Sequence, residues 1–198
     1  MQSPSCSLVA FSFSSSFARR DLTSAHSGSN FGCFFRGDPL SQTFLIEENG
    51  GCFLTKIDLF FSAKDTILPV WVEVRNVING YPGVKLLPFG RKVLEPSDVN
   101  VDADTGTSST TFTFDSPIYL EEAQEYCFVV MSNSLEYKVW ISQMGESDVS
   151  GSNRVISSQP HLGSLFKSQN NRTWDAVQSQ DMKFNLNKAV FSSQQAVV

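Results

Sequence analysis

The chain has 198 residues, a formal net charge of -5, a pI near 5.0 and a mean hydropathy of -0.12. This length supports one good-sized hydrophobic core or at most two small ones. The acidic balance argues against nucleic acid as a partner, because phosphates require a basic surface. No apolar run approaches the roughly 18 residues of a membrane-spanning helix, so no membrane partner is expected.

The first 36 residues differ in composition from the rest of the chain. They are rich in serine, contain the adjacent pair Arg19 and Arg20, and carry one acidic residue, Asp21. This composition is typical of an organelle transit peptide, but a flexible linker or a truncated start without an address is the preferred interpretation. We therefore expect residues 1–36 to be a disordered leader or linker, residues 37–191 a folded domain, and residues 192–198 a C-terminal tail.

The first expected strands lie on either side of a glycine-containing turn. "SQTFLI" (41–46) is followed by the turn signal "EENGG" and then by "CFLTKIDLFFSA" (52–63). In the second of these strands the alternation places five residues on one face: Phe53, Thr55, Ile57, Leu59 and Phe61. The other face carries Lys56 and Asp58 but also apolar residues, so both faces are expected to be partly covered.

The next segments continue the alternation typical of strands. "PVWVEVRNV" (69–77) places Val70, Val72 and Val74 inward, and "NGYPG" (79–83) is a turn in which glycine supplies the positive φ. Further strands are expected at "TTFTFDSPIYL" (110–120), "EYCFVVMS" (125–132), "YKVWIS" (137–142) and "MKFNLNKAVF" (182–191). Seven or eight short strands without helical periodicity predict an all-β fold, an antiparallel β-sandwich of jelly-roll type.

The four cysteines do not form a metal or disulfide framework. Cys6, Cys33, Cys52 and Cys127 include no CxxC pair, and the chain has only two histidines, so zinc-ligand spacing is absent. Cys52 and Cys127 lie in expected strands, where a small buried hydrophobic residue is the preferred interpretation over a disulfide.

Two other kinds of chemistry have only weak candidates. His161 lies three residues before Ser164, but no GxSxG motif surrounds them, and a loop histidine is the preferred interpretation. Asp102 and Asp104 offer oxygen ligands for calcium in "SDVNVDADTG", although an exposed acidic turn is the default. We expect no catalytic residue, no metal and no cofactor.

A glycan site is the more interesting candidate. Sugar sites combine an aromatic ring with planar polar side chains, because sugar faces stack while hydroxyl groups need polar partners. Trp174 has such neighbours in Asn170, Asn171 and Arg172, and Tyr81 is a weaker candidate. The alternative, which we favour, is that the Trp174 ring packs inward onto the sandwich and holds its loop in place.

Several segments occur in an order that resembles a known family. They are "DPLSQTF", "GCFLTKIDLFFSAKD", "PVWVEVRNVINGYPG", "FTFDSPIYLEEAQEYCFVV" and "QPHLGSLFKSQNNRTW". The series, over about residues 38–191, resembles a module of virion structural proteins of T4-like tailed phages, notably the tail and baseplate-associated chains of cyanophages. It is also similar to a wider group of extracellular jelly-roll modules used for surface anchoring or glycan binding.

The resemblance implies a β-sandwich without enzymatic activity, located in the virion tail, and it carries no catalytic residue over to this chain. We therefore expect a non-enzymatic structural component that contacts other virion structural proteins or further copies of itself. The alternative is a carbohydrate-binding module that recognises cell-surface glycans, in an extracellular or cell-surface location.

Overall fold

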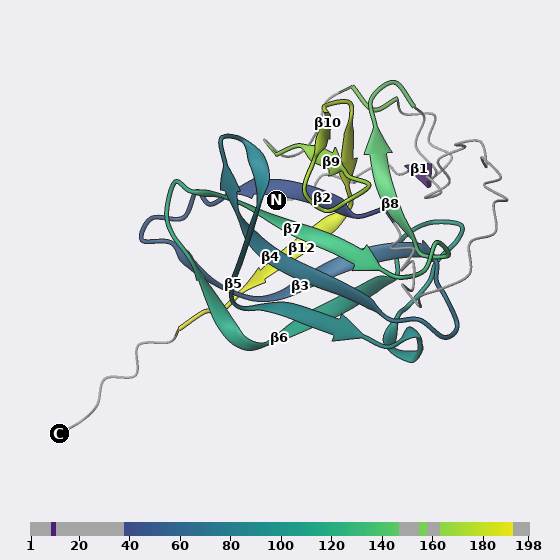
Figure 1. The fold of residues 1–198 in the computed structure, drawn as a ribbon, viewed down its shortest axis with the longest axis horizontal. Helices are drawn as coiled ribbons and strands as arrows, with labels where there is room; N and C mark the ends of the chain where they lie inside the picture. Colours follow the sequence, from purple (N-terminus) through teal and green to yellow (C-terminus); the bar gives the residue numbers. More distant parts are fainter. Residues whose placement is uncertain (1–8, 11–37, 147–154, 158–162, 192–198) are drawn as a thin grey trace, which may run out of the picture.

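Twelve β-strands and one short 3-10 helix, Pro96–Asp98, form the regular structure of the described residues, which are 9–10, 38–146, 155–157 and 163–191 of a computed structural model. The strands form two antiparallel six-stranded sheets that pack as a sandwich, which confirms the expected fold class (Figure 1). Within these residues, no helix has the length and apolar character to cross a membrane. The expected leader and tail lie outside the described residues, except that Val9–Ala10 forms β1.

Each sheet gathers strands from distant parts of the chain. Sheet I consists of β1 (Val9–Ala10), β8 (Lys138–Gln143), β11 (Gln180–Met182), β12 (Phe184–Lys188), β3 (Cys52–Ala63) and β6 (Ser109–Leu120). Sheet II consists, in spatial order, of β10 (Asp175–Val177), β9 (Leu165–Lys167), β2 (Leu40–Leu45), β7 (Glu125–Ser132), β4 (Val70–Ile78) and β5 (Tyr81–Leu94).

From β2 onward the chain passes repeatedly from one sheet to the other. Strands β2, β4–β5, β7 and β9–β10 belong to sheet II, while β3, β6, β8 and β11–β12 belong to sheet I. In sheet I, β3 pairs with β6 and β12, and its last residues pair with β8. Most neighbouring strands are therefore joined by long-range hydrogen bonding, so the fold depends on contacts between segments far apart in sequence.

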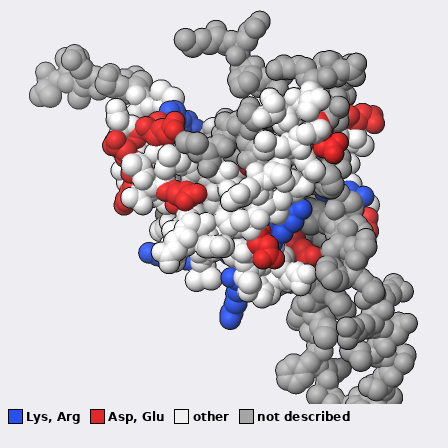
Figure 2. Space-filling model, turned by 90° about the horizontal axis from the view of Figure 1, so that it is seen from above, with Lys and Arg blue, Asp and Glu red and all other residues white. Residues whose placement is uncertain are grey.

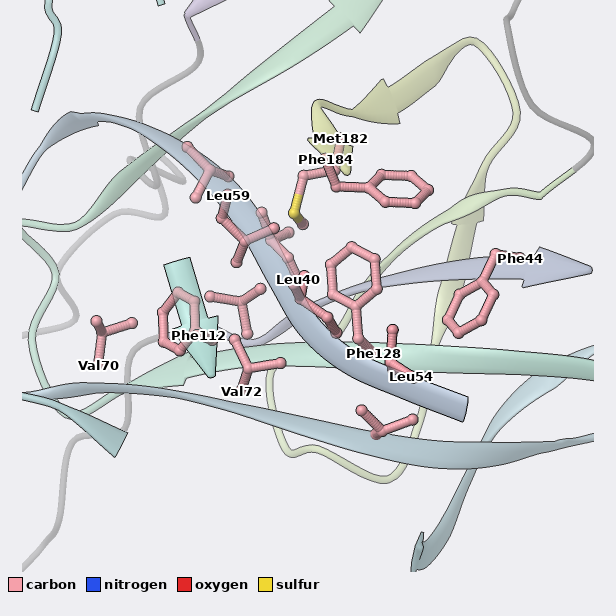
Figure 3. Packing of buried hydrophobic residues seen from close by; sticks show 14 of the residues in the cluster. Leu40, Phe44, Leu54, Leu59, Val70, Val72, Phe112, Phe128, Met182 and Phe184 are labelled. Carbon is pink, nitrogen blue, oxygen red and sulfur yellow. The ribbon is translucent and has the colours of Figure 1, made fainter. Parts of the chain in front are cut away.

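The main core lies between the two sheets and is filled by alternate side chains (Figure 3). Val70, Val72 and Val74 of β4 are fully buried in it, as the alternation predicts. Phe128 of sheet II meets Phe184 of sheet I with ring centroids 5.0 Å apart and planes at 65°. Aromatic contacts of this kind join the sheets across the interior.

The first residues of β3 face the opposite side of the sheet from the one predicted, because the strand contains a β-bulge. The pairing of β3 with β12 shifts register between Lys56, which pairs with Asn187, and Leu54, which pairs with Lys188, so Thr55 is the extra residue on this side. On the other side, residues 114–117 of β6 lie between the partners of Leu54 and Lys56. Beyond the bulge Ile57 faces the core as predicted, but before it the core residue is Leu54, at 1% exposure, and Phe53 is 37% exposed. The prediction that Phe53 shares the face of Ile57 was wrong, because one inserted residue reverses the facing of every residue before it.

Strand β5 was not predicted, and together with the short strands β1, β9 (Leu165–Lys167), β10 (Asp175–Val177) and β11 it brings the strand number of the described residues above the expected seven or eight. Its sequence "YPGVKLLPFGRKVL" contains Pro82 and Pro88, which are rare within central strands because proline has no N–H to donate. The strand forms because it lies at the edge of sheet II, with β4 as its paired neighbour. An edge position tolerates proline where a central position does not.

The turn between β4 and β5 is shorter than "NGYPG". Asn79 and Gly80 alone form it, with φ of 53° and 79°, and Ile78 pairs with Tyr81 across it. Two consecutive residues with positive φ suit the tight hairpin turns that match the twist of paired strands. Gly83, which the sequence assigned to the turn, belongs to β5.

The bulge in β3 gives a direct test with two adjacent residues. We expect Leu54→Ala to lower the free energy of unfolding by about 2 to 5 kcal/mol, because it opens a cavity in the core. Phe53→Ala should cost less than about 1.5 kcal/mol, since its ring is partly exposed and packs against the exposed rings of Tyr119 and Phe191. Urea unfolding monitored by circular dichroism measures both values. A larger loss of unfolding free energy for Phe53→Ala than for Leu54→Ala would contradict the assigned register.

Candidate functional site

The glycan-site candidates of the sequence lie over the outer face of sheet II. This face carries a second apolar cluster, separate from the core between the sheets. Its buried members are Trp71, Cys127, Val129, Met131, Phe166 and Trp174. Residues 168–174, which we call the covering loop, cross this face between β9 and β10. The outward side chains Trp71 and Arg75 of β4 are therefore buried, and Glu73 and Val77 are partly buried, in contrast to a sandwich whose outer faces are both exposed to solvent.

The covering loop is shaped by hydrogen bonds from its own short polar side chains. Ser168 Oγ accepts hydrogen bonds from the backbone N–H groups of Asn170 and Asn171, at 3.3 and 2.9 Å. Asn170 Oδ1 accepts from the N–H groups of Arg172 and Thr173, at 2.9 and 2.8 Å. Asn171 adopts a φ of 59°, a conformation that asparagine tolerates better than most residues. Side chains of Ser and Asn that bond to nearby backbone favour such turns.

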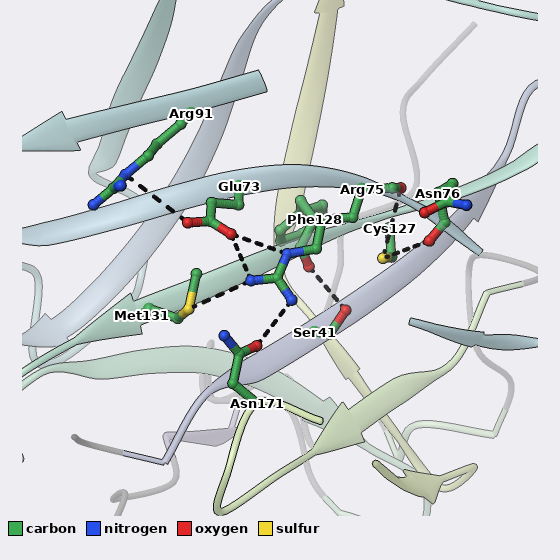
Figure 4. A network of polar contacts seen from close by, with 9 residues as sticks. All are labelled: Ser41, Glu73, Arg75, Asn76, Arg91, Cys127, Phe128, Met131 and Asn171. Carbon is green, nitrogen blue, oxygen red and sulfur yellow. Dashed lines mark hydrogen bonds and ion pairs between the residues drawn. The ribbon is translucent and has the colours of Figure 1, made fainter. Parts of the chain in front are cut away.

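A buried ion pair connects this loop to the sheet (Figure 4). The Arg75 side chain is 6% exposed and donates from Nε, at 3.0 Å, and from Nη2 to Oε2 of Glu73. Its Nη1 donates to Oδ1 of Asn171 at 2.9 Å. Arg91 lies near the second Glu73 oxygen, at 3.9 Å, and its guanidinium stands 5.5 Å from the centre of the Trp71 ring. The network therefore uses the Asn171 side chain to fix the loop.

The structure assigns Trp174 a packing position. Its side chain is 6% exposed within the outer cluster, and its indole Nε1 has no hydrogen-bond partner. The ring thus packs inward, as favoured, but onto the outer face of sheet II and outside the space between the sheets. A buried ring cannot stack on a sugar, so the geometry gives no support to a glycan site built on Trp174.

The other glycan candidates occupy the same face without forming one pocket. Asn170 is exposed, but its Oδ1 holds the loop backbone. Arg172 is exposed to solvent. Tyr81 is 53% exposed and its ring centroid lies 5.7 Å from that of Phe166. These side chains surround the covering loop on its solvent side, and a small hollow of about 40 Å³ beside Trp71 is too small for a sugar ring.

The calcium candidate Asp102 is a loop-forming residue. Its carboxylate accepts hydrogen bonds from the backbone N–H and the hydroxyl of Thr105, at 2.9 and 2.6 Å, and from the same groups of Thr107, at 2.8 and 2.9 Å. These bonds hold the pKa of Asp102 well below its usual range. Asp104 is exposed, and in the described part of the chain no group of three acidic, histidine or cysteine side chains could hold a metal ion.

The loop formed by Asp102 covers an aromatic ring. The Asp102 carbonyl accepts a hydrogen bond from Trp140 Nε1 at 2.8 Å. Gly106, with a φ of 60°, lies against the Trp140 ring so closely that an added Cβ would stand 2.9 Å from it. Asp102 therefore shapes a loop that covers Trp140, which is a structural role.

The remaining candidates for reactivity are the cysteines, His161 and Ser164. Cys52 and Cys127 are both free thiols, and burial raises the pKa of Cys127 to about 11, which makes it unreactive. Cys6, Cys33 and His161 lie outside the described residues. Ser164 donates its backbone N–H to the Thr43 hydroxyl at 2.9 Å, at the junction between β2 and β9.

One buried acid links the two sheets and was not anticipated. Asp181 of β11 is 1% exposed and accepts a hydrogen bond at 3.0 Å from Nε2 of Gln42, which lies in β2 and is fully buried. Gln42 Oε1 in turn accepts from the Met182 backbone N–H at 2.9 Å, while Asp181 Oδ2 has no partner. Burial raises the pKa of Asp181 to about 6 despite the hydrogen bond from Gln42.

Three exposed apolar features were also missed by sequence reasoning. They are the edge strand β5, a row of aromatic rings on the outer face of sheet I, and a cleft of about 480 Å³ that opens between β2 and β12. The face seen in Figure 2 is largely uncharged, with acidic side chains in small groups and isolated basic ones. Strand β5 was missed because its segment 82–90 contains prolines and glycines, which are unusual in strands. The row of aromatic rings was missed because the bulge in β3 reverses the expected facing of Phe53.

No family model, no curated protein and no solved structure matches this chain.

The buried ion pair of the outer face can be tested by removing one charge. We expect Glu73→Gln to lower the free energy of unfolding by about 3 kcal/mol, because it leaves the Arg75 guanidinium buried without a counter-charge. Glu48→Gln, which removes the exposed pair with Lys188, should change stability little and serves as the control. Equal effects of the two substitutions in urea unfolding would contradict the proposed role of the network.

Asp181 predicts a pH dependence of stability with a defined sign. Its folded pKa of about 6 lies above the usual value near 3.9, so the folded state favours the protonated acid. The contribution of Asp181 to the free energy of unfolding should therefore be greatest below about pH 4 and be lost as the pH rises through 6. Asp181→Asn mimics the protonated acid and should raise the free energy of unfolding at pH 7 by up to about 3 kcal/mol.

The measurement is urea unfolding of both proteins at several pH values between 4 and 8. The difference between Asp181→Asn and the wild type should grow up to about pH 6 and then remain constant. Parallel stability curves over this range would show that Asp181 does not titrate as expected.

Proposed function

We propose that this chain is a non-enzymatic structural component of a phage virion, a tail or baseplate-associated module that acts through protein–protein contacts. The observation that carries the proposal is the set of exposed apolar side chains on β5, the edge strand of sheet II, which stand beside the basic residues Lys85, Arg91 and Lys92. The sequence resemblance to tail-associated virion modules and the sandwich architecture support it.

Strand β5 exposes an unusual amount of apolar surface for an edge strand. Val84 is 73% exposed and Phe89 64%, and Leu86 and Val93 are also exposed. Apolar edge strands are a liability in isolated proteins, because their unpaired backbone and side chains can join another chain. A component of a larger assembly avoids this liability when a partner covers the edge.

A bulge within β5 presents Phe89 outward. Arg75 pairs with Leu86 and Glu73 with Arg91, so residues 87–90 of β5 face Val74 alone on β4. Within this bulge Leu87 packs against the core, and Phe89 adopts a φ of 61°. A left-handed conformation costs energy for a bulky aromatic residue and is commonly retained where it serves a contact. Exposed aromatic residues of this kind are typical anchors of protein interfaces.

The proposal is tested on virus particles. Mass spectrometry of purified particles from the virus that carries this reading frame should detect the chain, and antibodies against it should label the tail in electron micrographs. Absence of the chain from purified particles would overturn the proposal.

The role of the β5 edge is tested separately by lysine substitution. We expect the double variant Val84→Lys/Phe89→Lys to enter particles about tenfold less than the wild type, because charged edges oppose strand association and an anchor is lost. Leu135→Lys alters a residue of similar exposure, 62%, in the loop between β7 and β8, and should enter particles normally. Thermal unfolding establishes that both variants fold, and normal incorporation of the double variant would exclude β5 as the contact.

A further inference from the structure

The outer face of sheet I carries three exposed aromatic rings in a row. Phe53 of β3 lies at the centre, with Tyr119 of β6 and Phe191 on its two sides at centroid distances of 5.1 and 5.3 Å. Their exposed fractions are 37%, 49% and 71%. We call these residues the aromatic row. Phe53 and Phe191 meet edge to face, with their planes at 83°.

The position of Tyr119 in this row is fixed by the neighbouring turn. Its hydroxyl donates to the Gly50 carbonyl at 3.1 Å. Gly51, with a φ of 76°, approaches so closely that an added Cβ would lie 2.3 Å from the Leu120 carbonyl and 3.0 Å from the Tyr119 hydroxyl. The ring is therefore held in place before any ligand arrives, which reduces the entropic cost of binding.

Polar side chains continue the same face along the three strands. Asp58 of β3 lies between Asn185 of β12 and Thr111 of β6 in the strand register. Its two carboxylate oxygens accept hydrogen bonds from Thr111 Oγ1 at 2.6 Å and from Asn187 Nδ2 at 2.9 Å. The amide and carboxylate planes are thereby oriented, while Thr111 and Asn185 remain exposed.

The length and the charge of this face restrict the ligand. Five residues separate Phe53 from Asp58, which at about 3.3 Å per residue corresponds to roughly 16 Å along β3. Lys56 and Asp58 carry opposite charges on the outer side of the same strand, so the charges of β3 balance on this face. An elongated and uncharged ligand matches these properties.

We propose that the outer face of sheet I binds a neutral polysaccharide chain. Each sugar ring has apolar C–H faces that stack on aromatic rings and hydroxyl groups that bond to amides, carboxylates and hydroxyls, so linked sugars satisfy both parts of this face. A protein partner would have to bury the Asn, Asp and Thr side chains together with the rings and to pair each of them. The inference does not depend on the virion function proposed above.

The test is isothermal titration of the full chain with four neutral hexasaccharides: cellohexaose, maltohexaose, mannohexaose and chitohexaose. We expect saturable binding of at least one of them. Tyr119→Ala should weaken it by about tenfold, which corresponds to about 1.4 kcal/mol. Asp58→Ala should also weaken it, whereas Tyr119→Phe should largely retain it because the ring is kept.

Tyr81→Ala is the matched control, since Tyr81 is 53% exposed but lies on sheet II. It should leave the affinity unchanged, and thermal unfolding of every variant verifies the fold. Lack of saturable binding to all four sugars overturns the proposal, as does binding that Tyr81→Ala abolishes and Tyr119→Ala does not. Sedimentation that shows a dimer dissociated by Tyr119→Ala, without sugar binding, would identify the face as a contact between copies.

Discussion

The packing of sheet II depends on one constraint, which is that both of its faces are apolar. The inner face of β4 carries valines of the main core, and its outer face carries Trp71 within a second buried cluster. An uncovered cluster of this size would expose a large apolar area to water. The chain covers it with β9 and the covering loop, which supply Phe166 and Trp174. The course of the chain after β8 follows from this requirement.

The guanidinium group of Arg75 on that outer face is buried by the same covering and is paired there. Arg75 is held between Glu73 and Asn171. A buried charge without partners would destabilise the fold, but here the paired guanidinium anchors the loop. Trp174 supplies the apolar part of the same attachment. A loop whose composition resembles a sugar-reading loop is therefore a structural cover, since its aromatic ring and the amide oxygens of Asn170 and Asn171 are used internally.

Once sheet II is closed by its own chain, the exposed apolar surface lies elsewhere. The β5 edge and the aromatic row of sheet I are on different sheets, and they differ in kind. The first is an edge with a strained, outward Phe89, which suits association with another chain. The second is a sheet face where tilted aromatic rings adjoin oriented amide and carboxylate groups, which suits a sugar polymer. A virion module that also contacts polysaccharide would use both without competition.

The sequence by itself determined the fold class and most strands, because alternation and turn signals are local. The valines of β4, the strand at residues 125–132 and the turn signal "EENGG" were all readable in this way. It also identified Asn170, Asn171 and Trp174 as the residues of one loop, but their local composition is equally compatible with a sugar site and with a cover.

Only the tertiary structure decided which faces are covered. The bulge at Thr55 turned Phe53 outward, and an edge position allowed β5 to contain two prolines. The burial of Trp174 and the link between Gln42 and Asp181 join segments more than 90 residues apart in the chain. Such outcomes depend on long-range strand pairing and on the packing of distant segments, and no local pattern of residues specifies them.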